Sequence, residues 1–81
     1  MRYRVGHVGV AFTHHAVARA EERGIGLRTA AWTAYLSPPR WVGPMVAQLI
    51  DDELVVVAEL IPGWGWRVVT VYRLGSDAGG Q

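Results

Sequence analysis

The chain has 81 residues, a formal net charge of +1, no cysteine and an apolar content of 51%. This length supports one domain with one hydrophobic core, and the apolar content excludes an intrinsically disordered segment. The lack of cysteine excludes disulfides and thiolate catalysis, and it suits a reducing compartment, so we expect a cytoplasmic protein. All eight basic residues are arginine, so any contact with nucleic acid depends on local clustering of guanidinium groups.

The first apolar segment is predicted to be a strand over residues 3–12, because Val8, Val10 and Phe12 alternate with small residues. The alternative is a secretory signal peptide, since two arginines precede the apolar stretch and residues 18–20 resemble a cleavage site. Histidines within and just after the stretch disfavour that alternative. We therefore expect the segment to belong to the folded domain.

A helix is predicted over residues 14–23. Thr13 is suited to be its N-cap. Gly24 is suited to the position just after the helix end, where the backbone adopts the left-handed conformation. At 100° per residue this helix has an apolar face, formed by Ala16, Val17 and Ala20. Its other side is polar and carries His15, Arg19, Glu22 and Arg23.

A second helix is predicted from Gly26 or Leu27 to about Leu36, because two prolines then end it. Residues 40–44 follow as a loop or a short edge strand. Strands are predicted over residues 45–50 and 54–61, with a polar hairpin connection between them.

The last strand is predicted over residues 64–73, after a turn at Pro62-Gly63. Strict alternation gives this strand two faces. One face would carry Trp64, Trp66, Val68, Thr70 and Tyr72, and the other Gly65, Arg67, Val69, Val71 and Arg73.

The predicted fold class is α+β in the order β-α-α-β-β-β. Three to four antiparallel strands would form the sheet, with the two helices packed on one face. We expect residues 1–73 to form a single domain and residues 74–81 to form a flexible C-terminal tail. No segment approaches the ~20 apolar residues of a membrane span, so no membrane contact is expected.

His15 and Arg19 are the leading candidates for chemistry, because side chains four apart are neighbours on a helix. A nearby cation favours the neutral histidine, which can accept a proton near neutral pH. Arg19 and Arg23 are suited to hold a phosphate. The alternative is a solvated helix face with a glutamate–arginine pair.

The end of the last strand supplies a second group of candidates. Tyr72 and Arg73 are suited to a phosphodiester site, and Thr70 to orienting a histidine. The alternative is a core tyrosine with its hydroxyl in water and an arginine that caps the sheet edge. Trp64 and Trp66 would form a base-stacking platform if exposed, although large aromatic side chains more often belong to the core.

No metal site or cofactor is predicted. His14 and His15 diverge by about 100° around the helix, so the histidines do not converge as zinc ligands do. The acidic residues 51–53 provide too few ligands for a calcium loop. The chain contains neither a P-loop nor a dinucleotide-binding fingerprint.

The string FTHHAVARAEERGI, residues 12–25, resembles the opening signature of the bacterial family called domain of unknown function 4258. That signature runs aromatic-Thr-x-His-Ala-x-x-Arg-x-x-x-Arg-Gly-Ile. The segment VTVYR, residues 69–73, is similar to the closing strand of the same family. The resemblance covers about residues 10–73, but the segment 37–45 departs from the charged loop that the family would have there.

The family lies near the RelE-like and BrnT-like toxin ribonucleases, so the resemblance implies metal-independent cleavage of RNA. In such chemistry a base takes the 2′-hydroxyl proton and an arginine stabilises charge on the phosphate. An antitoxin or another protein partner is implied as well. The implied catalytic residues are His15, Arg19 and Tyr72, and the implied RNA- or phosphate-binding residues are Arg23, Arg73 and Thr70.

This assignment requires the polar side of the first helix to meet the end of the last strand around an open, anion-sized hollow. Two other functions stay open. The first is a non-catalytic, phage- or plasmid-borne module that binds a host or cognate protein, or a second copy of itself. The four tryptophans and the low net charge favour this function. A module of this kind is expected to have an exposed tryptophan patch. An inactive remnant of the fold is also compatible with the sequence.

Overall fold

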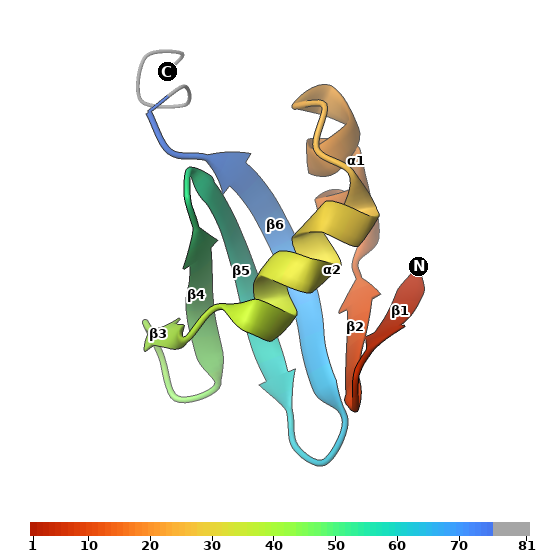
Figure 1. Ribbon diagram of the computed structural model, residues 1–81, viewed down its shortest axis with the longest axis vertical. Helices are drawn as coiled ribbons and strands as arrows, with labels where there is room; N and C mark the ends of the chain where they lie inside the picture. Colours follow the sequence, from red (N-terminus) through yellow and green to blue (C-terminus); the bar gives the residue numbers. More distant parts are fainter. Residues whose placement is uncertain (76–81) are drawn as a thin grey trace.

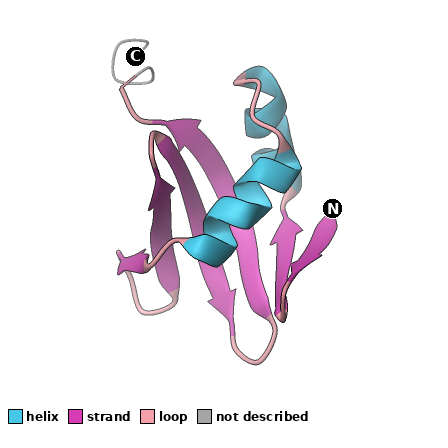
Figure 2. Cartoon of the chain, in the orientation of Figure 1, coloured by secondary structure: helices cyan, strands magenta, loops and turns pink. Residues whose placement is uncertain are grey.

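The computed structural model describes residues 1–75 of the chain. In this range the two helices are α1 (His14–Glu22) and α2 (Leu27–Leu36). The six strands form one sheet in the order β1-β2-β6-β5-β4-β3, and both helices lie on the same face of it (Figures 1 and 2). The strands are β1 (Arg2–Val5), β2 (Val8–Phe12), β3 (Pro39–Trp41), β4 (Val46–Asp51), β5 (Leu54–Ile61) and β6 (Gly65–Arg73).

The α+β class with two helices is confirmed, but the predicted sheet of three to four antiparallel strands is wrong. The predicted first strand is a hairpin of β1 and β2, because Gly6 has a φ of 61° and occupies the first central position of a two-residue turn. The segment after α2 adds β3 as an antiparallel edge strand. These two additions bring the sheet to six strands within the described residues.

The sheet is mixed rather than antiparallel, because β2 and β6 pair in parallel. Gly9 and Gly65 face each other in this pair, and a Cβ on Gly65 would clash with the carbonyl oxygen of Gly9. The φ of Gly65 is 153°, which also favours glycine. The close approach of β2 and β6 therefore depends on a glycine at this position.

The predicted signals at the ends of α1 are confirmed. The Thr13 hydroxyl accepts a hydrogen bond from the Ala16 N–H at 3.0 Å. Gly24 has a φ of 65°, and the Ile25 N–H donates to the Ala20 carbonyl at 2.8 Å, the bonding of a Schellman motif. Ile25 is buried, so the helix end is anchored in the core.

The core lies between the helices and the sheet. Small side chains on the helices let them approach the sheet closely, and β-branched or aromatic side chains fill the space from the other side. The helices contribute Ala16 and Ala20 from α1 and Ala30, Ala31 and Ala34 from α2. The sheet contributes Val10, Phe12, Leu49, Val56, Trp66, Val68 and Val71.

A β-bulge interrupts the alternation of β6. Val57 pairs with Thr70, but the next residue, Ala58, pairs with Val68, so Val69 is an extra residue without a partner on β5. The face of each later residue is therefore opposite to the one that strict alternation gives.

The bulge makes the predicted faces of the last strand wrong. Trp66 and Val68 are buried beneath the helices as expected, but Val71 joins them there. Thr70 and Tyr72 consequently point to the face of the sheet that the helices leave uncovered. Sequence alternation alone cannot locate such a bulge.

Of the predicted tail, residues 76–81 lie outside the described residues. Over residues 1–75, neither helix has the length and apolarity that a bilayer crossing requires.

Candidate functional site

Two predicted phosphate-binding arginines meet where α1 ends beside the end of β6. Arg23 Nη1 donates to the Val71 carbonyl at 3.0 Å, and Arg73 donates to the carbonyls of Arg23 and, at 3.3 Å, Gly24. We call this cluster the α1–β6 corner. Both guanidinium groups bond to backbone carbonyls across nearly fifty residues of chain, so they join the helix end to the last strand.

The location of the corner follows from the sheet pairing. β2 pairs with β6 only as far as Phe12 and Val68, so it leaves the edge of β6 beyond that point without a strand partner. The chain enters α1 there, and the Thr13 N–H donates to the Val68 carbonyl at 3.0 Å. Arg23 then supplies a donor to the next outward carbonyl, that of Val71.

His15 and Arg19 are neighbours on the polar side of α1. His15 is exposed, whereas Arg19 is partly covered and forms an ion pair with Glu22 at 2.6 Å. An exposed pair of this kind contributes about 0–1 kcal/mol to stability. Glu22 therefore occupies one side of the Arg19 guanidinium group, and an RNA phosphate would have to bind the remaining side.

Tyr72 and Thr70 lie on the other face of the sheet. The Tyr72 hydroxyl accepts a long hydrogen bond from Gln48 Nε2 at 3.4 Å, across the intervening strand β5. Thr70 pairs with Val57 of β5. The structure therefore brings Arg23 and Arg73 together and keeps His15 beside Arg19, but it does not bring Tyr72 or Thr70 to either pair.

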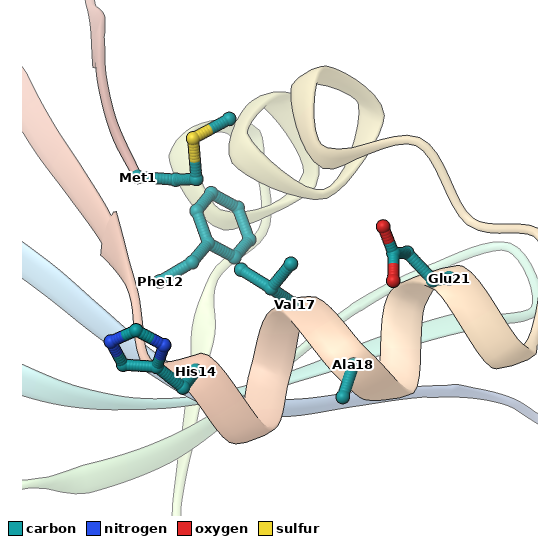
Figure 3. Close-up of a pocket in the computed structure, with 6 residues that line it drawn as sticks. All are labelled: Met1, Phe12, His14, Val17, Ala18 and Glu21. Carbon is teal, nitrogen blue, oxygen red and sulfur yellow. The ribbon is translucent and has the colours of Figure 1, made fainter.

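A hollow of about 320 Å³ lies beside α1, on the side that faces the N-terminus (Figure 3). Its floor is apolar, and His14 and Glu21 are its titratable residues. None of the six predicted site residues, all of which the structure describes, lines it. The lining residues are Met1, Phe12, His14, Val17, Ala18 and Glu21.

The face of the sheet opposite the helices carries a cluster of arginines that the sequence reasoning did not select. We call it the open face. Arg2 and Arg4 alternate with the core-packed Tyr3 and Val5, and they pair with Ala11 and Gly9. Arg67 also pairs with Ala11, and Arg40 pairs with Gln48 of the same face. Spacing of i, i+2 within one strand could have found Arg2 and Arg4, whereas Arg40 and Arg67 have no arginine two residues away.

The open face has a strong excess of positive charge. It holds four of the eight arginines of a chain whose net charge is only +1, namely Arg2, Arg4, Arg40 and Arg67, and all four are exposed. Among the paired strand positions of this face that the structure describes, Glu59 is the one acidic residue, and it forms an ion pair with Arg67.

A second hollow, of about 230 Å³, lies on the open face near the start of β6. Trp64 forms one wall, and two arginines lie on its rim. We call it the Trp64 hollow; it is lined by Arg2, Ala11, Ile61, Trp64 and Arg67.

Exposed apolar side chains gather on α2 and on the segment that follows it. Trp32 and Trp41 are 47% and 49% exposed, whereas Trp64 is half-buried and Trp66 is buried. We call this group the apolar patch; it consists of Trp32, Tyr35, Leu36, Trp41, Val42 and Met45.

No group of three or more histidine, aspartate or glutamate side chains is placed to hold a metal ion within residues 1–75. Comparisons of the chain with known protein families, curated proteins and solved structures find no match.

We expect Arg73→Ala to lower the free energy of unfolding by about 1 kcal/mol, because it leaves two carbonyls at the end of α1 without their donor. Urea unfolding followed by circular dichroism would measure this loss. Arg28→Ala, which removes an exposed arginine of α2, is the matched control and should change stability little. Equal stability of the two variants would show that the corner is not a structural cross-link.

Proposed function

We propose that this chain is an RNA-binding domain that holds RNA on the open face. The observation that carries the proposal is the concentration of four exposed arginines, against one glutamate, on one face of a nearly neutral chain. A local field of this sign attracts a polyanion although the net charge is small. The resemblance to toxin ribonucleases is the reason for naming RNA as the polyanion.

The spacing of the arginines suits an extended backbone. Arg2 and Arg4 lie on edge strand β1, Arg40 lies on the opposite edge strand β3, and Arg67 lies between them on β6. With ~4.8 Å between neighbouring strands, the two edges are about 24 Å apart. A single strand of RNA that crosses the sheet would meet guanidinium groups at both edges and near the middle.

The middle of the open face supports contact with bases rather than with phosphates. Between the arginines the face carries the half-buried Tyr72, Thr70 and Gln48 and several aliphatic side chains, of which Val55 is buried. The Tyr72 ring and hydroxyl are suited to stacking and hydrogen bonding with an unpaired base. Tyr72 and Thr70 thus have a place in RNA binding here, away from His15.

We expect the double variant Arg2→Ala/Arg4→Ala to weaken binding of a labelled single-stranded RNA and to reduce its salt dependence. The slope of log K against log salt should fall by about 0.7 for each phosphate contact removed. Fluorescence anisotropy at several salt concentrations measures both quantities. Arg28→Ala, on the helix side, is the control that should keep the wild-type slope; a double variant with the wild-type slope would contradict the proposal.

A separate, narrower proposal is that the helix side of the domain, apart from the open face, cleaves RNA without a metal, with His15 as the base and Arg19 as the phosphate contact. It is supported by the exposure of His15 and its position next to Arg19 on α1. Arg23 and Arg73 have structural roles at the α1–β6 corner, which leaves His15 and Arg19 as the chemistry-bearing pair of this side.

If the domain cleaves RNA, His15→Ala should lower the cleavage rate by about 100-fold or more, because it removes the proton acceptor. His14→Ala is the matched control, since His14 is also exposed but lines the hollow beside Met1 and Phe12. Both variants are surface changes and should unfold like the wild type. Equal cleavage by the two variants would remove His15 from the mechanism.

A protein-interaction module is the second candidate function, and the apolar patch favours it. Exposed aromatic and aliphatic side chains close together are typical of binding surfaces. Leu36 is 64% exposed, so Leu36→Ser should not disturb the core. If this function is correct, the wild type should self-associate in analytical ultracentrifugation and Leu36→Ser should be monomeric; a monomeric wild type removes self-association from consideration.

A further inference from the structure

We infer that the Trp64 hollow is a subsite for one unpaired nucleobase, stacked on the indole of Trp64, with an adjoining phosphate between Arg2 and Arg67. This inference rests on the proposed RNA-binding function and identifies single-stranded RNA as its ligand class.

The backbone fixes Trp64 on both sides. The Trp64 N–H donates to the Ile61 carbonyl at 3.0 Å and closes the turn, in which Gly63 has a φ of 78°. The Trp64 carbonyl accepts a hydrogen bond from the Gly9 N–H at 2.9 Å, so the turn is joined to β2. The position of this tryptophan is therefore set before any ligand binds.

The indole lies directly against the backbone of Gly9. A Cβ added at Gly9 would lie 2.5 Å from Cε2 and Cζ2 of the indole, so any side chain there would displace the ring. Trp64 is only half-buried, which leaves part of it accessible from the hollow. A ring that is supported by backbone and accessible from outside is suited to stacking, because little conformational entropy is lost on binding.

The hollow has the size of one ring system. Its volume of about 230 Å³ is smaller than the ~300–1,000 Å³ of pockets for drug-sized ligands. Ala11 lies between the two arginines in the register of the sheet, and its small side chain leaves the space open. Ile61 supplies an apolar wall, which suits a base better than a sugar or a phosphate.

The rim carries the charge that a nucleotide needs beside its base. Glu59 pairs with Nη2 of Arg67 and restricts the position of the guanidinium group, but the Arg67 side chain is 52% exposed, so the rest of the group is open to a phosphate. Arg2 lies across Ala11 on the outer strand β1. A planar guanidinium group binds phosphate oxygens through two parallel hydrogen bonds, so this pair favours a phosphate between them.

These features favour an unpaired base over the other occupants. In a duplex both faces of a base are covered by its neighbours, so a paired base cannot stack on the indole. An acidic peptide would satisfy the arginines but would leave the aromatic wall without a stacking partner. The hollow therefore favours single strands over duplexes.

The test compares Trp64→Leu with the wild type in anisotropy titrations with a labelled oligouridylate of about ten nucleotides. The loss of one stacked base should weaken binding about tenfold, and the quenching of tryptophan fluorescence on binding should decrease. Trp32→Phe, on α2, is the matched control and should keep the wild-type affinity. Ala11→Leu is a second variant that fills the hollow and retains Trp64, and it should weaken binding to a similar extent.

The outcomes separate this inference from the proposed function. If both Trp64→Leu and Ala11→Leu bind the oligouridylate with wild-type affinity, the base subsite is overturned. It is also overturned if the wild type binds an abasic oligomer of the same length as tightly as the oligouridylate. Either result leaves RNA binding on the open face intact. A wild-type protein without salt-dependent affinity for any RNA overturns both. If the protein binds an acidic peptide in a Trp64-dependent way but does not bind the oligouridylate, the ligand is a protein and the nucleobase subsite is overturned.

Discussion

The parallel pairing of β2 with β6 is the constraint on which the rest of the structure depends. It joins the first and last parts of the described chain at a point where two glycine backbones approach each other closely, Gly9 and Gly65. The pairing places α1 and α2 in the connection between β2 and the other strands, and both helices cover one face. It also brings the turn before β6 against β2, which is why the indole of Trp64 rests on Gly9.

The limited extent of this pairing divides the arginines into two groups. Because β2 stops at Phe12, the end of β6 needs another partner, and Arg23 and Arg73 supply it together with the end of α1. The other strand arginines, Arg2, Arg4, Arg40 and Arg67, have no such task and lie on the open face. The residues of the resemblance in α1 therefore lie on one side of the sheet, whereas the four exposed arginines of the open face lie on the other.

The sequence predicted the helices and most strand positions because their signals are local. The Thr13 cap, the Gly24 end and the Pro62-Gly63 turn each act over a few residues, and all three are present. The parallel pair was missed because it joins segments more than fifty residues apart. The candidate site was only partly predictable: neighbours on one helix, such as His15 and Arg19, follow from spacing, whereas the face of Tyr72 depends on a bulge that no local pattern announces.

The bulge at Val69 has a consequence for how this strand tolerates changes of length. Removing Val69, the extra residue, would restore uninterrupted pleating without changing the pairing of Val68 with Ala58 or of Thr70 with Val57. Val71 would stay beneath the helices and Tyr72 on the open face. If β6 kept Val69 but paired without the bulge, Val71 and Tyr72 would exchange environments, with a phenol in the packed core and a valine in solvent. The bulge therefore determines which side chains of β6 each face of the domain presents, and Val69 is the position at which this strand can lose a residue without changing them.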